Sequence, residues 1–144
     1  MKKFLPGIKK IEYCKAVNLQ LDNEGPVKMP LRVYGPFANI DLVGLGALSI
    51  GDEVIKGNRI FNVRLQCEVC NRNNELITLI EILKHNDVVY RITTVDDTRY
   101  LLGSEQKPWP SFFSGIEIDG EPQGKNSVNI EILYSNSHAL LLLE

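Results

Sequence analysis

Turn-forming residues divide this sequence into many short segments, and their spacing constrains the fold more than any other feature. Clusters rich in Gly, Pro, Asn and Asp fall at 22–26, 35–36, 51–52, 56–58, 71–74, 85–87, 96–97, 103–110 and 119–126. The runs between them contain many β-branched and aromatic residues, a pattern typical of antiparallel β proteins. We therefore expect a mostly β fold, a single-domain antiparallel β-barrel or sandwich with at most one or two short helices.

Two regions show the alternation of strands most clearly. Residues 88–95 and 98–103 flank Asp96 and Asp97, which predicts a β-hairpin. In the segment 127–134, apolar and polar residues alternate, so one face of a strand is expected to be buried. The apolar positions there are Val128, Ile130, Ile132 and Tyr134.

Two other segments leave helix and strand both open. Residues 73–85 contain apolar side chains that fit a helical stripe, but Leu76, Thr78, Ile80 and Ile82 also fit alternation. The many β-branched residues favour a strand there. Residues 37–50 are apolar with two glycines, which fits either a strand with a bulge or a short helix.

The bulk composition limits the class of protein. The chain has 144 residues, of which 44% are hydrophobic, so one domain spanning 1–144 with a sizeable core is expected. Its 16 Lys and Arg against 18 Asp and Glu argue against a nucleic-acid partner. The longest apolar run, 139–143, is far below the ~20 residues of a membrane helix, and the start lacks a signal-peptide core. We expect a cytoplasmic protein with no membrane partner.

Cys67 and Cys70 have the C-x-x-C spacing found in metal and redox sites. The residues before them, 61–67, alternate as a strand, and on a strand positions i and i+3 point to opposite faces. The two sulfurs would then diverge, and no second ligand pair occurs in the sequence. We expect a strand with Cys67 facing the core, and no metal site.

No catalytic residue set or cofactor motif is apparent. Glu117 and Asp119 share one strand face, where paired acids can perform acid–base chemistry or simply form a solvated surface. Asp96 and Asp97 suit a hairpin turn. His85 and His138 have no evident nucleophilic partner, and the glycines complete no nucleotide-binding fingerprint. We expect no catalytic, cofactor-binding or metal-binding residues.

Two apolar features are candidate partner-binding sites. Trp109 stands between Pro108 and Pro110, with Phe112 and Phe113 close behind. Prolines restrict the backbone, so the aromatic rings could serve as rigid binding anchors, or Trp109 could fold back over one end of a sheet. The tail 140–143 is either a buried last strand or a subunit contact. The partner-binding candidates are Trp109, Phe112, Phe113, Leu140 and Leu142.

One stretch of the chain also carries a family resemblance. After the hairpin come Tyr100-Leu101-Leu102-Gly103, a polar spacer, Pro108-Trp109-Pro110, and the closing strand Val128-Asn129-Ile130-Glu131-Ile132. This pattern, best over 88–134, resembles small uncharacterised virion and tail-assembly proteins of tailed bacteriophages and prophages; the opening Leu5-Pro6-Gly7-Ile8-Lys9 is also similar. The resemblance implies a β-rich structural or assembly protein that works in a multimer and, if the chain is phage-derived, a location in the virion particle. It carries no catalytic motif.

The sequence therefore leaves two alternative functions open. The first is a non-enzymatic structural or assembly protein, such as a component of a phage or prophage tail module, that contacts itself, other assembly proteins, or both. The alternative is a β-barrel that binds a small ligand or performs hydrolysis at its mouth.

Overall fold

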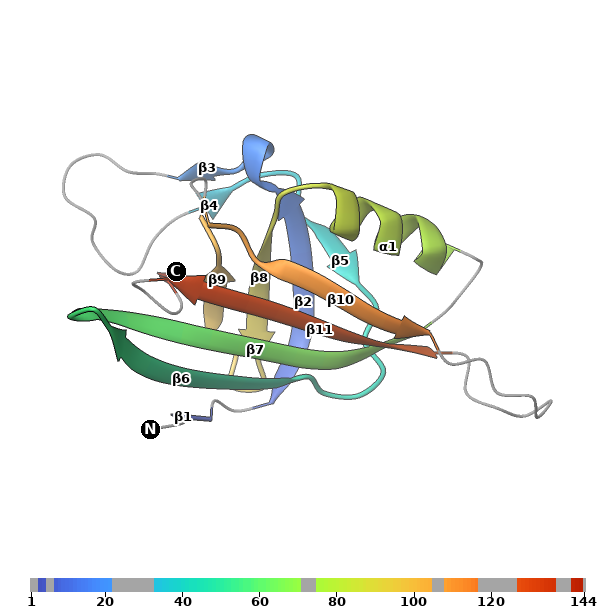
Figure 1. Cartoon of the computed structure of the whole chain (residues 1–144). Helices are drawn as coiled ribbons and strands as arrows, with labels where there is room; N and C mark the ends of the chain where they lie inside the picture. Colours follow the sequence, from blue (N-terminus) through green and yellow to red (C-terminus); the bar gives the residue numbers. More distant parts are fainter. Residues whose placement is uncertain are drawn as a thin grey trace.

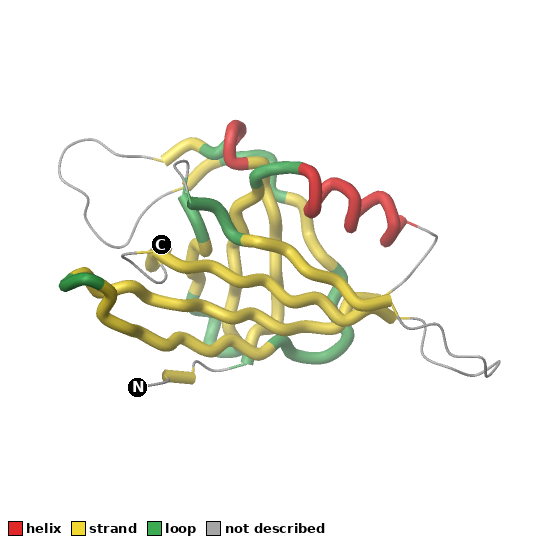
Figure 2. Tube along the Cα trace, in the orientation of Figure 1, coloured by secondary structure: helices red, strands yellow, loops and turns green. Residues whose placement is uncertain are grey.

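Two antiparallel sheets lie face to face, with strands that cross in projection, and one α-helix lies beside them (Figures 1 and 2). The computed structural model describes residues 3–4, 7–21, 33–70, 75–104, 108–116, 127–136 and 141–143. Within these ranges each sheet has five strands; one sheet has a two-residue strand at one edge, and the other has a three-residue strand at each edge. In these ranges the sheets form a sandwich and do not close into a barrel, so the sandwich alternative of the predicted fold is confirmed.

The strands are named in sequence order. Sheet A contains, from edge to edge, β1 (Lys3–Phe4), β6 (Ala47–Ile55), β7 (Asn58–Cys70), β11 (Ser127–Asn136) and β10 (Ser111–Ile116). Sheet B contains β12 (Leu141–Leu143), β9 (Arg99–Leu102), β8 (Val88–Thr94), β2 (Ile8–Lys15) and β5 (Ala38–Ile40). The 3-10 helix η1 (Ala16–Asn18) precedes a small pair, β3 (Gln20–Leu21) and β4 (Val33–Tyr34).

The main core fills the space between the sheets. It consists of Ile8, Ile11, Ile40, Leu48, Val63, Leu65, Val69, Ile80, Leu83, Val88, Tyr90, Ile92, Leu102, Val128, Ile130, Ile132 and Tyr134. Strand β11 alternates as predicted over 128–134: Val128, Ile130, Ile132 and Tyr134 are buried, whereas Asn129 is exposed. The hairpin is also confirmed, because β8 pairs antiparallel with β9 across the 95–98 turn. Alternation therefore identified the inner faces of these strands correctly.

Strand β8 is buried on both faces, which the sequence pattern did not indicate. Val88, Tyr90 and Ile92 face the main core, whereas Val89 belongs to a second core on the outer face of sheet B. That second core consists of Cys14, Ala16, Leu19, Val89, Leu101 and Leu143, with Val33, Phe37 and Trp109 packed against it. Much of the outer face of sheet B is therefore covered by the chain itself.

The strand favoured for 73–85 is wrong. Residues 75–85 form α1 (Glu75–His85), while 73 and 74 lie outside the described ranges. Leu79, Ile80 and Leu83 have helical spacing and pack into the main core, and this burial outweighs the β propensity of the segment. The Asn86 side chain donates a hydrogen bond of 2.9 Å to the Ile82 carbonyl near the end of the helix.

The segment 37–50 is neither a single strand nor a helix. It contains β5, an isolated bridge from Leu42 to Val69, a turn, and the start of β6. Gly44 in that turn has φ +73°, a conformation that side chains disfavour. The chain thus passes from sheet B to sheet A, and the Ile8–Gly46 bridge connects the sheets at the same corner.

Candidate functional site

A hollow of about 600 Å³ lies over three neighbouring strands of sheet A. Its lining comes from β7, β11 and β10, and comprises Gln66, Cys67, Phe113, Ser114, Asn129, Ile130 and Glu131. Ile130 is buried in the main core, whereas Gln66, Phe113 and Asn129 are exposed. The hollow therefore opens on the outer face of the sheet, which faces away from sheet B. We call it the sheet A hollow.

Strand register brings the polar and aromatic residues of the hollow together. Glu131 lies between Gln66 on one neighbouring strand and Phe113 on the other, so the three side chains form one row across the sheet. Asn129 belongs to the next row on the same face, opposite Gly115. Because these residues are far apart in sequence, only the pairing of β7, β11 and β10 reveals the site.

The carboxylate in this row is held in place by a cation. Arg64 Nε donates to Glu131 Oε1 at 2.8 Å, and Arg64 Nη2 donates to Oε2 at 3.4 Å. This two-pronged geometry orients the carboxylate and offsets its charge. The pair is partly exposed, so its contribution to stability is small.

Cys67 lies at the floor of the hollow but does not provide a reactive thiolate. Its strand is confirmed as β7, and its side chain packs against the main core, as predicted. Burial raises the pKa of the Cys67 thiol to about 12, and burial also raises the pKa of the Cys14 thiol.

The predicted partner-binding residues fall in different environments. Trp109 packs against the second core, and its Nε1 donates to the Ser104 carbonyl at 3.1 Å. Phe112 packs against the main core, whereas Phe113 is 51% exposed beside the hollow. Leu140 lies outside the described residues, and for Leu142 only the backbone is described, in β12.

The loop that carries Trp109 is held close to sheet B at Gly103. Gly103 has φ +102°, and an added Cβ would lie 3.0 Å from Pro110 Cδ and 3.0 Å from Val89 Cγ1. A side chain here would therefore strain the backbone and displace the loop. Trp109 therefore folds back against sheet B, which is one of the two positions that the sequence left open.

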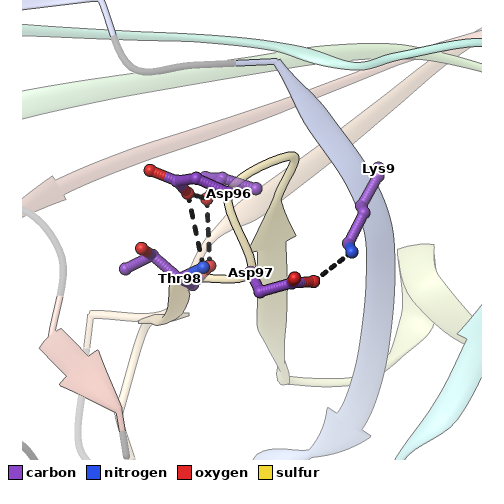
Figure 3. Close-up of polar contacts among 5 residues, drawn as sticks. Lys9, Asp96, Asp97 and Thr98 are labelled. Atoms are coloured by element: carbon purple, nitrogen blue, oxygen red, sulfur yellow. Dashed lines mark hydrogen bonds and ion pairs between the residues drawn. The ribbon is translucent and has the colours of Figure 1, made fainter.

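Asp96 and Asp97 lie in the β8–β9 turn, where their side chains form hydrogen bonds and an ion pair (Figure 3). Asp96 accepts hydrogen bonds from the Thr94 hydroxyl and from the Thr98 backbone N–H, and Asp97 pairs with Lys9 of β2. The Thr94 hydrogen bond is the main reason why the pKa of Asp96 lies below its ordinary value. These acids therefore stabilise the β8–β9 turn and its contact with β2.

The remaining candidates can be placed only in part. His85 is the last residue of α1, and its Nε2 lies 2.9 Å from Glu81 Oε2. Glu117, Asp119 and His138 lie outside the described residues, and the side chain of Cys70 is not described. In the described ranges, no group of three or more His, Cys, Asp and Glu residues is placed to hold a metal ion.

A feature that sequence reasoning missed is the tip of the β6–β7 hairpin. Val54 and Ile55 are 60% and 44% exposed, and they directly precede the turn at Lys56 and Gly57. The sequence indicated the turn at 56–58. It gave no sign that the ends of β6 and β7 next to this turn extend past the core. We call Val54 and Ile55 the hairpin tip.

Comparisons with protein-family models, curated proteins and solved structures give no match to this chain. Within the part of the chain that is described, no helix is both long and apolar enough to cross a membrane.

Proposed function

We propose that this chain is a non-enzymatic structural or assembly protein that associates with copies of itself through the hairpin tip. The observation that carries the proposal is the exposure of two neighbouring branched apolar side chains, Val54 and Ile55, at the end of a long hairpin (Figure 1). Single exposed apolar residues are common on monomers, but an adjacent pair on a projecting element favours a contact site.

The hairpin is stiffened close to its tip. Lys56 and Gly57 both have positive φ, at 50° and 81°, as in the tight two-residue turns that match strand twist. Asp52 pairs with Arg59 across the hairpin, and Arg59 lowers the pKa of the Asp52 carboxyl. A stiff element loses little conformational entropy when it binds, so more of the burial energy contributes to association.

Further hydrogen bonds tie the hairpin to the next strand. Asn62 donates to Glu53 at 3.1 Å, and Ser135 of β11 donates to Asn62 at 2.6 Å. These bonds connect β6, β7 and β11 just below the tip. The tip is therefore supported by three strands of sheet A.

Each side of the hairpin presents one apolar residue of the tip: Val54 opposite Arg59, and Ile55 opposite Asn58. Val54 and Ile55 are consecutive, and consecutive side chains of a strand point to opposite faces. The resemblance to phage virion and tail-assembly proteins supports the same class of function, and we propose a cytoplasmic location before assembly.

The contact surface is tested by sedimentation velocity on the double variant Val54→Asp/Ile55→Asp. A matched control is Ile77→Asp, because Ile77 is 63% exposed on α1 and lies away from the tip. We expect the wild type and the control to associate and the double variant to sediment as a folded monomer. Equal association of all three proteins would show that the tip is not the contact.

A further inference from the structure

The sheet A hollow supports an inference that goes beyond assembly. We propose that it binds a neutral saccharide, with Phe113 as the stacking platform and Gln66, Asn129 and Glu131 as hydrogen-bonding partners. Its lining shares no residue with the hairpin tip, so the two proposals stand or fall separately.

The size of the hollow fits a small ligand. Its volume of about 600 Å³ lies within the range of about 300–1,000 Å³ that is usual for ligand sites. Three paired strands form its floor, so its shape is fixed by the sheet and not by a loop. A ligand therefore meets a site whose backbone is already in place.

Phe113 gives the hollow an apolar wall. Its side chain is 51% exposed on the outer face of sheet A. The neighbouring Phe112 points to the opposite face of β10 and packs against the main core. On the outer face, the next residue of β10 is Gly115, which has no side chain to cover the ring from that side. A half-exposed ring beside polar groups suits the C–H face of a sugar, which is apolar at its centre and polar at its rim.

The polar groups in the hollow offer both donors and acceptors. The Gln66 and Asn129 amides each carry an acceptor oxygen and two N–H donors. The Glu131 carboxylate offers acceptor lone pairs beyond those used by Arg64, which holds it in a fixed orientation. Sugar hydroxyls both donate and accept, so they match this mixture.

The charge balance of the hollow argues against other ligand classes. Among its lining residues, Glu131 carries the only formal charge at neutral pH, which disfavours an anion. Arg64 offsets that charge, which removes much of the attraction for a cation. An apolar ligand would cover the Gln66 and Asn129 amides without replacing the water bound to them. A neutral polyhydroxylated ligand avoids all three costs.

The test is ¹⁵N NMR titration of the full chain with trisaccharides of glucose, galactose, mannose and N-acetylglucosamine, and with a sialylated trisaccharide. The variants are Phe113→Ala and Asn129→Ala. Leu133→Ala is the control, because Leu133 is exposed on β11 but does not line the hollow. Thermal melts of each variant separate loss of binding from loss of folding.

We expect at least one neutral trisaccharide to shift the backbone amides of 66, 113, 129 and 131. Phe113→Ala and Asn129→Ala should each weaken that binding about tenfold while the protein stays folded, and Leu133→Ala should leave it unchanged. The proposal is overturned if no neutral trisaccharide binds, if only the sialylated one binds, or if folded Phe113→Ala binds as tightly as the wild type.

Discussion

Glu12 and Arg91 form an ion pair on the outer face of sheet B that is largely removed from solvent. Arg91 Nε and Nη2 donate to the two Glu12 carboxylate oxygens at 3.0 Å and 2.7 Å. The guanidinium also lies 4.1 Å from the centre of the Phe37 ring. The hydrogen bonds between Glu12 and Arg91 and the stacking of Arg91 on Phe37 offset the cost of removing both charges from water beside the second core. Either charge alone in this place would destabilise the folded state.

Removing one partner of this pair should destabilise the fold. We expect Glu12→Gln to lower the free energy of unfolding by about 3 kcal/mol, because it leaves the Arg91 charge without its counter-ion. Lys10→Gln is the control; Lys10 is half exposed and 3.8 Å from Glu12, so its loss should cost less than about 0.5 kcal/mol. Urea denaturation at neutral pH measures both, and equal effects would contradict this account.

The same pair predicts a pH dependence. The Arg91 hydrogen bond is the largest cause that lowers the pKa of Glu12 from its ordinary value of 4.5. A lowered pKa in the folded state adds stability above pH 4.5, and that stability is lost as the pH falls through the lower, folded-state pKa. The difference in unfolding free energy between wild type and Glu12→Gln should therefore be constant between about pH 6 and about pH 7, and it should shrink below pH 4.5. A difference that grows on acidification would refute the assignment.

The thiols of Cys14 and Cys67 should be unreactive in the folded protein. With a pKa of about 12, only about one Cys67 in ten thousand is a thiolate at pH 8. In a Cys70→Ser variant, we expect both remaining thiols to react slowly with a disulfide reagent until denaturant is added. Rapid reaction of one thiol under native conditions would show that its side chain is accessible and ionised.

At the scale of elements, α1 shows where local pattern is insufficient. Its sequence fits both a helical stripe and alternation, and the β-branched residues favoured the wrong choice. The deciding factor is tertiary, because Ile80 and Leu83 reach the main core only from a helix beside β10 (Figure 1). By contrast, β11 and the β8–β9 hairpin were predictable, since one strong alternation and one short polar turn define each.

Two isoleucines on α1 provide a test of its orientation. Ile80 is 5% exposed in the main core, whereas Ile77, on the same helix, is largely in solvent. Ile80→Ala should cost about 2–4 kcal/mol of unfolding free energy, and Ile77→Ala less than about 0.5 kcal/mol. Similar losses at both positions, measured by urea denaturation, would mean that the helix does not pack on the sandwich as described.

At the scale of the whole molecule, the sequence predicted the fold class but not the sites. Turn spacing and alternation are local signals, and they sufficed to predict a mostly β fold, but they left barrel and sandwich both open. The sheet A hollow combines β7, β11 and β10 through pairings of distant segments, which one sequence does not reveal. Exposure also depends on packing. Trp109 and Phe113 looked alike in sequence, but Trp109 packs against the second core and Phe113 lies at the surface.

The measurement that tests the proposed function most directly is size-exclusion chromatography with light scattering on the wild-type chain over a wide concentration range. Self-association through the hairpin tip predicts a mass above that of the 16.2 kDa chain which rises with concentration or remains at a fixed multiple. A mass equal to one chain at every concentration would contradict self-assembly through Val54 and Ile55.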